Sequence, residues 1–444
     1  MNNSLLNDFS VVSSKQWKQK IQFELQGEDY NESLVGKTKE GINIKPFYHP
    51  DDVNTSLSLS DVIDPSWKAS RKLYIANSQK GNEKIKNSLN SNPESLILTL
   101  RSVKIKAEEL FHELDLQGTE LHLQTEFLSA DYIKDLAEFL SDKKWQVFLH
   151  IDIIGKLVKE GNWFYNLNKD FSILKEILNF SAPFNSVISI DAAVYHNAGA
   201  NIVQQLAYAV AHANEYLNFN PSGPFVFKTA TGPDLFFETA KIKALRLLWH
   251  VLCKEYNLHT PCHIIAFPGL RHQTLVADDL NKTRNMYACT SAVLGGADIV
   301  CNLPYDFFYK KENLKSATLA ARQLNTLKES LPSEIINGSY YPEELTWNLA
   351  EKALLIFKQI EKGGGFLKQL KNHTIQKKIS ENANIEQKEF IDQHHEYFKN
   401  TALINDIELY PFVKTNRRKT LIQPFIAERL SEHFEKGKIK PQQF

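Results

Sequence analysis

Eight short apolar runs, separated by longer stretches with helical character, recur between residues 71 and 330 of this 444-residue chain. Such runs are typical of strands buried on both faces of a parallel sheet. Strands that alternate with helices are joined by right-handed crossovers, and eight such units close into a barrel. We therefore predict an α/β fold, a (β/α)8 TIM-type barrel; an open doubly wound sheet is the alternative, but no GxGxxG follows the first run. The runs are Leu73–Ala76, Leu96–Leu100, Leu121–Leu123, Val147–Ile151, Val187–Ile190, Phe225–Phe227, His263–Phe267 and Ile299–Leu303.

The segments on either side of this repeat have a different character. Residues 1–70 are polar, with a helical stretch around Trp17 and an extended stretch at 40–48, and we expect an N-terminal arm that lies over its own barrel or wraps a partner subunit. Residues 71–330 form the predicted barrel. Residues 331–444 are predicted to be a helical extension, with a long helix over 343–361 that ends at three consecutive glycines, 363–365, and a charged helical tail.

Composition excludes several classes of function. Lysine plus arginine equal aspartate plus glutamate at 52 each, so no overall field attracts nucleic acid or an anionic membrane. The basic cluster at 414–419 is expected to be a solvated face. The four cysteines show no CxxC spacing, which favours a reducing compartment. Without a signal peptide or an apolar run of about 18 residues, we expect a soluble, cytoplasmic protein that binds neither nucleic acid nor membranes.

Polar residues at the ends of the apolar runs are the candidates for chemistry, because catalytic groups of barrel enzymes lie at the carboxyl ends of the strands. Asp191 and Lys228 would form an acid–base pair or an activated lysine; the alternative is an ion pair that fixes two loops. His196 and His272 lie just beyond strand ends, where histidine often transfers protons. The other strand-end candidates are Arg101, Gln124, Asp152, Thr229 and Asn302.

Metal and nucleotide motifs give no further candidates. No P-loop, nucleophile elbow or HExxH occurs, and none of the 14 histidines shows a ligand spacing, so we expect no metal site. His394 and His395 are expected to be exposed on a helix. His212, His250 and His259 are expected to be ordinary, partly buried imidazoles.

Four separate motifs resemble the methylmalonyl-CoA mutase family of adenosylcobalamin-dependent acyl-CoA mutases. The stretch 235–249 is similar to a barrel helix of the family, with Phe-Phe-x-x-x-Ala-Lys followed by Arg-x-Leu-Trp. The stretch 338–350, which continues at Glu361-Lys-Gly-Gly364, resembles the segment after the barrel. Glu40-Gly-Ile42 with Pro46-Phe-Tyr48 resembles the entry to the fold, and Leu294–Asp306 resembles the Gly-Gly-Ala-Asp…Leu-Pro-Phe-Asp of the small subunits. The resemblance covers residues 10–430.

The resemblance implies a (β/α)8 barrel through which catalytic members thread an acyl-CoA, and a separate domain that binds cobalamin through Asp-x-His-x-x-Gly. We expect no such domain here: the nearest string, Asp392–Tyr397, has tyrosine in place of the glycine. Aligned on Ala198-Gly199-Ala200, Ala193 and Val194 stand where catalytic members have tyrosine and histidine. Tyr195 and His196 are thus offset by two residues, about 6 Å along an extended backbone. The family's Arg-Thr-His-Ser-Gln-Thr-Ser-Gly survives only as Leu270–Thr274.

These departures are typical of a small, non-catalytic subunit. The resemblance implies that the chain is the small (β) subunit of a heterodimeric methylmalonyl-CoA mutase, an isomerase of propionate metabolism. Its large (α) subunit would bind adenosylcobalamin and interconvert succinyl-CoA and (R)-methylmalonyl-CoA. This chain would bind no cofactor and be inactive alone. The alternatives are an autonomous barrel enzyme or acyl-CoA binder, or the small subunit of a related acyl-CoA mutase. The remnants of a site would be Asp191, Tyr195, His196, Lys228 and His272.

Overall fold

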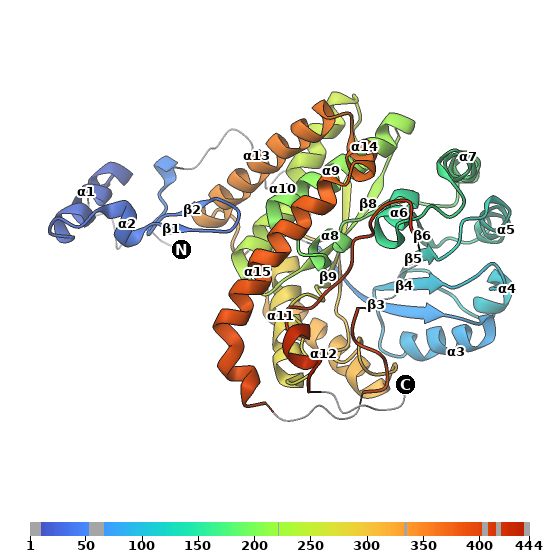
Figure 1. Cartoon of the computed structure of the whole chain (residues 1–444). Helices are drawn as coiled ribbons and strands as arrows, with labels where there is room; N and C mark the ends of the chain where they lie inside the picture. The colour runs from blue at the N-terminus through green and yellow to red at the C-terminus, as the bar shows by residue number, and fades with distance from the viewer. Residues whose placement is uncertain are drawn as a thin grey trace.

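A closed ring of eight parallel strands forms the centre of the computed structural model, which describes residues 10–52, 66–220, 222–332, 335–401, 407–413 and 419–438. Around the ring the strands follow the order β10-β3-β4-β5-β6-β7-β8-β9 (Figure 1). The predicted barrel is confirmed, and each predicted run overlaps one strand. The strands are β3 Lys68–Ile75, β4 Ser95–Leu100, β5 Glu120–Thr125, β6 Gln146–Ile151, β7 Ser186–Asp191, β8 Phe225–Thr231, β9 Cys262–Pro268 and β10 Ile299–Cys301.

Helices surround the ring and connect successive strands. In α5, for example, the buried residues Ile133, Leu136, Ala137 and Leu140 recur every three or four positions, so that one face packs on the sheet. The barrel helices are α3 Ser78–Leu89, α4 Ala107–Leu110, α5 Ala130–Leu140, α6 Ile153–Glu160, α7 Leu167–Leu178, α8 Ala193–Asn197, α9 Ile202–Phe219, α10 Leu235–Glu255, α11 Asp278–Leu294 and α12 Leu314–Ser330.

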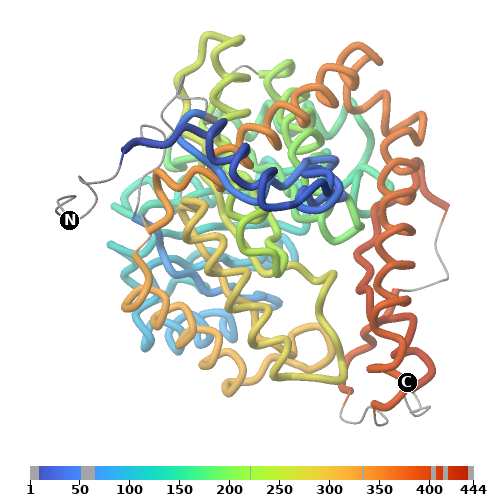
Figure 2. The backbone as a smooth tube through the Cα atoms, turned by 90° about the vertical axis from the view of Figure 1, so that its left-hand side faces the viewer, coloured from blue at the N-terminus to red at the C-terminus, as the bar shows by residue number. Residues whose placement is uncertain are grey.

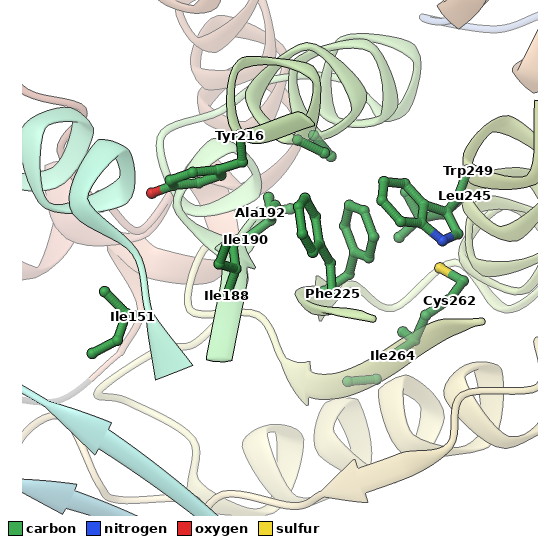
Figure 3. Close-up of a cluster of buried hydrophobic side chains, with 14 of the residues drawn as sticks. Ile151, Ile188, Ile190, Ala192, Tyr216, Phe225, Leu245, Trp249, Cys262 and Ile264 are labelled. Atoms are coloured by element: carbon green, nitrogen blue, oxygen red, sulfur yellow. The ribbon is translucent and has the colours of Figure 1, made fainter. Parts of the chain in front are cut away.

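The main hydrophobic core lies between the strands and these helices. Figure 3 shows its part between β7–β9 and helices α9 and α10. The Trp249 ring packs against Phe225 and Phe227, with centroids 5.3 and 5.1 Å apart. This packing fixes the positions of β7, β8 and β9, whose carboxyl ends carry most of the candidate residues.

Side chains also fill the inside of the ring. Five buried residues from four strands form a separate cluster there, and β4 and β8, which both contribute, lie on opposite sides of the ring. Phe148 and Phe267 pack against this cluster. Because inward-facing side chains meet across the axis, the barrel interior is a packed core. The five residues are Ile97, Val226, Ile265, Ile299 and Cys301.

The arm begins with α1 Ser14–Glu24 and α2 Tyr30–Leu34, and continues with β1 Gly36–Lys37, β2 Asn43–Ile44 and the short helix η2 Pro50–Asp52. It projects from one side of the barrel beside α13 (Figure 1), and in the view turned by 90° it lies in front of the barrel helices (Figure 2). Lys45 forms an ion pair with Glu344 of α13 at 2.9 Å. The stretch 40–48 expected to be extended contains one short strand, β2, which pairs with β1.

After the barrel come α13 Tyr340–Lys362, α14 Phe366–Lys371, α15 Thr374–Lys399 and α16 Glu432–Glu435. The long helix α13 packs across α9 and α10 and ends at Gly363, as the three glycines predict. It begins three residues earlier than the predicted helix. Most of the basic cluster, 414–418, lies outside the described residues. Among the described residues, no helix is long and apolar enough to span a bilayer.

Candidate functional site

A cavity of about 360 Å³ opens at the carboxyl ends of strands β4 to β8. Five of the predicted strand-end residues line it: Arg101, Gln124, Asp152, Asp191 and Lys228. The structure therefore brings these five together, each placed by the end of its own strand. Thr229 and Asn302 are not part of the lining. The amide of Asn302 donates instead to the carbonyl of Ala320 and to Gln323, on the outer helix α12.

Asp191 and Lys228 are register partners on β7 and β8. The Lys228 ammonium lies 3.8 Å from the Asp191 carboxylate and donates to the Gln124 side chain at 3.3 Å. A nucleophilic lysine needs a free, neutral amine, whereas the Lys228 amine is held between a carboxylate and an amide. This geometry favours the ion pair over the acid–base pair. It joins the ends of neighbouring strands and presents a positive group to the cavity.

Asp152 accepts hydrogen bonds from several segments that form the wall of this cavity. It follows β6 directly and is the N-cap of α6, where it accepts from the Gly155 N–H at 2.7 Å. The same carboxylate accepts from the Asp191 N–H at 2.8 Å. Burial would raise the pKa of Asp152, but the charge and hydrogen bond of His212 and the charge of Lys228 outweigh it and lower the pKa to about 2. Asp152 is therefore an ionised structural acceptor.

Tyr195 and His212 extend this network away from the cavity. The Tyr195 hydroxyl lies 2.9 Å from His212 Nδ1, and His212 Nε2 lies 2.9 Å from Asp152. Tyr216, one helical turn after His212, donates to the same carboxylate at 2.8 Å. Burial, with the charge of Asp152, raises the pKa of Tyr195 well above its ordinary value. Tyr195 is thus a neutral core phenol that does not line the cavity.

Sequence reasoning missed the role of His212, which was expected to be only partly buried. It is completely buried on α9, with Tyr216 four residues later on the same helix face. That spacing was a weak signal for a shared acceptor. The acceptor itself, Asp152, lies 60 residues earlier in the chain. The spacing of residues within one helix does not identify a partner so distant in the chain.

His196 and His272 occupy a second place, between the β7–β9 loops and α15. His196 packs against Gly269 and Gly232, at distances that leave no room for a Cβ atom on Gly269. Burial lowers the pKa of His196 well below its ordinary value, so the ring is neutral. His272 lies 3.9 Å from Glu386 of α15. Neither histidine lines the cavity that holds Asp191 and Lys228, and neither does Tyr195. The five predicted remnants of a site therefore do not form one site.

Gly199, in the turn after α8, lies directly against α15. Its φ is +93°, and a Cβ atom would lie 2.6 Å from the Ala383 Cβ. We expect Gly199→Ala to lower the free energy of unfolding by about 2–4 kcal/mol, from backbone strain and displacement of α15. Gly338→Ala is the matched control, because Gly338 has φ +76° but open space around it; about 1 kcal/mol is expected. If urea denaturation shows the same loss of unfolding free energy in Gly199→Ala and Gly338→Ala, the contact with α15 does not contribute to stability.

The string Asp392–Tyr397 lies inside the continuous helix α15. The His394 ring stacks on Phe390, with centroids 4.2 Å apart, and its Nδ1 lies 3.0 Å from the Phe390 carbonyl. The ring is thus packed along its own helix. These residues do not fit a cobalamin-binding motif.

Comparisons with known proteins point to the same family as the four sequence motifs. A family model described as Methylmalonyl-CoA mutase matches residues 105–399. The chain is 27% identical to "Methylmalonyl-CoA mutase small subunit" of Porphyromonas gingivalis, over 89% of this chain and 70% of that one. It is 25% identical to the small subunit of the same name in Propionibacterium freudenreichii, over 82% and 64%. It is 28% identical to the corresponding large subunit of that organism, over 52% and 35%. The chain thus spans about two thirds of these small subunits and about a third of the large one.

Proposed function

The chain belongs to the methylmalonyl-CoA mutase family, and on this premise we propose that it is the non-catalytic small subunit of adenosylcobalamin-dependent methylmalonyl-CoA mutase. The large subunit would bind adenosylcobalamin and acyl-CoA and interconvert succinyl-CoA and (R)-methylmalonyl-CoA. This chain would stabilise that subunit by binding its folded state. Two small-subunit relatives matched over more than four fifths of the chain support this role.

One observation carries the proposal: the tyrosine that comes nearest to the family's catalytic tyrosine is built into the core. The Tyr195 hydroxyl is engaged by His212, and aromatic rings pack around it, including Phe366 and Phe425. It therefore has no access to a substrate at the rim. Side chains also pack the barrel axis, with Phe148 and Phe267 beside the inner cluster, which argues against an extended acyl-CoA chain at that point.

The arm offers the surface for a partner. Val11 is 96% exposed and Phe23 is 80% exposed, and Trp17 is half exposed on the same segment. Apolar side chains that gather on a projecting segment are typical of protein–protein contacts. The relatives named as small and large subunits of one organism support a heterodimer.

The test is to mix the purified chain with the large subunit from the same organism and analyse the mixture by size exclusion. We expect co-elution and a higher melting temperature of the large subunit. Phe23→Asp, on the arm, is expected to weaken co-elution by tenfold or more, since about 2 kcal/mol of apolar burial is lost. Leu314→Asp, at an equally exposed leucine of α12, is the control and should have no effect. Separate elution of the two wild-type chains would contradict the proposal.

The second candidate function is acyl-CoA binding, and the polar cavity supports it. Arg101, Lys156, Lys159 and Lys228 line it, and such cations suit the phosphates of a CoA. On our account, calorimetry with the isolated chain shows no acyl-CoA binding. Binding that Lys228→Ala abolishes, while the folded structure is retained in circular dichroism, would favour the binder instead.

A further inference from the structure

A carboxylate and two imidazoles converge at the N-terminal mouth of the barrel. Glu120 is the first residue of β5, and His122, two positions later, faces the same side of the strand. His263 is the second residue of β9. In the ring, β5 and β9 are four strands apart of eight, so they stand on opposite sides. The three side chains therefore meet across the barrel axis.

Their donor atoms point at one another. Glu120 Oε1 lies 3.0 Å from His122 Nε2 and 3.2 Å from His263 Nε2. All three donor atoms lie within 4.8 Å of each other. Donors around a tetrahedral zinc ion, bound at about 2.0–2.2 Å, are ~3.4 Å apart. The ion fits if each of the two distances from Glu120 Oε1 to an imidazole nitrogen lengthens by a few tenths of an ångström. The two imidazole nitrogens would also have to move closer to each other.

The surrounding residues hold the three ligands in place. His122 Nδ1 lies 2.9 Å from His150 Nε2, which lets His122 donate its second N–H while Nε2 faces the ion. Lys68 binds the other oxygen of Glu120, and leaves Oε1 for the imidazoles. The Phe148 ring stacks on both imidazoles, at 4.8 and 4.6 Å between centroids. Such outer contacts are the ones that orient the ligands of metal sites.

We propose that Glu120, His122 and His263 bind a divalent transition-metal ion, zinc by preference, which ties β5 to β9 across the N-terminal mouth of the barrel. Two imidazoles and one carboxylate form a donor set that zinc accepts, with water in the fourth position. The N-terminal face of such barrels serves stability, whereas chemistry lies at the opposite face. The ion would therefore stabilise the barrel by binding its folded state.

The test is a titration of the full-length chain, first freed of metal with a chelator, with Zn²⁺ in a calorimeter. We expect one equivalent to bind and the melting temperature to rise. Glu120→Gln and His263→Gln each keep a polar group of similar size, and should weaken binding at least ~100-fold. His395→Gln is the control, because His395 is exposed on α15 and would be an adventitious zinc ligand. Its affinity for Zn²⁺ should equal that of the wild type.

A second measurement does not depend on the variants folding well. Co²⁺ bound by the wild-type chain should give the visible absorption of a low-coordinate site, and Zn²⁺ should displace it. Melting curves of metal-free variants show whether each has folded. A wild type that binds no Zn²⁺, or His263→Gln with unchanged affinity, would overturn the proposal and leave the cluster as hydrogen bonds to Glu120. Loss of binding in His395→Gln would overturn it as well.

Discussion

Asp152→Ala is expected to lower the free energy of unfolding by about 3–5 kcal/mol, because it removes a buried charge and leaves several donors without an acceptor. Its carboxylate accepts from His212 and Tyr216 of α9 and from the backbone N–H groups of Gly155 and Asp191. These partners belong to three different segments of the rim. Urea denaturation followed by circular dichroism measures the loss. We also expect the ends of β6 and β7 to become less protected in amide exchange.

Asp191→Ala is the matched control for Asp152→Ala. It removes the same group one strand away, where the carboxylate is partly exposed and forms a single 3.8 Å ion pair. The pair is long, and Lys228 keeps its hydrogen bond to Gln124 when Asp191 is removed, so a smaller loss than in Asp152→Ala is expected. An equal loss in the two variants would show that the rim as a whole, rather than the Asp152 network, determines stability.

The pH dependence separates the charge of Asp152 from its hydrogen bonds. Its pKa in the folded chain, about 2, is below the ordinary value of 3.8, so the ionised group stabilises the fold above pH 4. That contribution declines as the pH falls toward 2. Asp152→Asn carries no charge at any pH. The difference in unfolding free energy between wild type and Asp152→Asn should therefore shrink between about pH 6 and about pH 3. A constant difference would contradict the lowered pKa.

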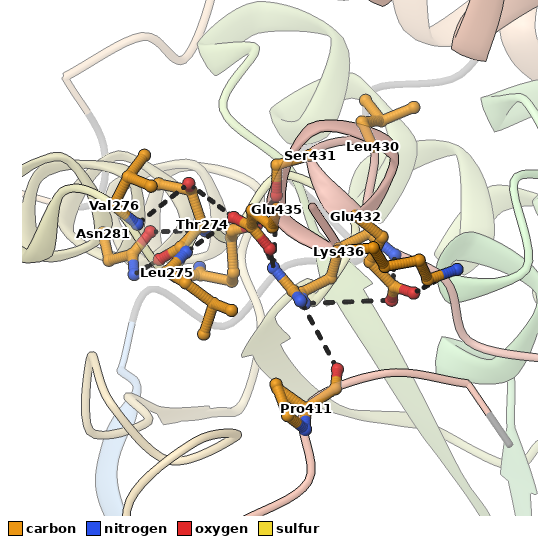
Figure 4. A network of polar contacts seen from close by, with 12 residues as sticks. Thr274, Leu275, Val276, Asn281, Pro411, Leu430, Ser431, Glu432, Glu435 and Lys436 are labelled. Atoms are coloured by element: carbon orange, nitrogen blue, oxygen red, sulfur yellow. Dashed lines mark hydrogen bonds and ion pairs between the residues drawn. The ribbon is translucent and has the colours of Figure 1, made fainter. Parts of the chain in front are cut away.

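Glu435→Ala is expected to release the C-terminal segment from the barrel. Glu435 binds Arg429 at 2.5 Å and accepts from Thr274 Oγ1 and the Leu275 N–H at 2.8 and 2.7 Å (Figure 4). Arg429 and Glu435 are both fully buried. Breaking a buried ion pair by removing one partner costs about 3–5 kcal/mol, because the other charge is left uncompensated. The segment around α16 should undock before the barrel unfolds.

Hydrogen exchange at the Leu275 amide measures this release, since its N–H is bonded to Glu435. A rise of about a hundredfold or more in its exchange rate is expected, because each 1.4 kcal/mol of local stability changes the open population tenfold. Lys436→Ala is the control: Lys436 is half exposed and lies 3.7 Å from the buried Glu432, and this long contact is expected to contribute under 1 kcal/mol. Unchanged exchange at Leu275 in Glu435→Ala would contradict the buried pair as the anchor.

The barrel could be predicted from the sequence because its strands are local signals. A run such as Leu96–Leu100 is buried along its whole length, and no partner needs to be known to recognise it. Strand ends also predicted which residues meet at the rim, as Asp191 and Lys228 do. The last strand is shorter than its apolar run, since β10 ends at Cys301 and the Asn302 side chain turns outward to α12.

The orientation of individual side chains could not be predicted in the same way. Tyr195 and His196 are neighbours in the short helix α8, yet Tyr195 faces the core near His212 and His196 faces the loops under α15. Their directions follow from α8, a helix of five residues, and helices this short are not stable on their own. His122 and His263 are likewise 141 positions apart, and their meeting follows from ring closure. Spacing along the chain carries no information about such pairs.

Activity of the isolated chain tests the central claim most directly. The chain is given adenosylcobalamin and methylmalonyl-CoA, alone and together with the large subunit, and the formation of succinyl-CoA is followed. We predict no turnover above background by the chain alone and sustained turnover by the mixture. Turnover by the chain alone at a rate near that of the mixture would contradict a non-catalytic barrel.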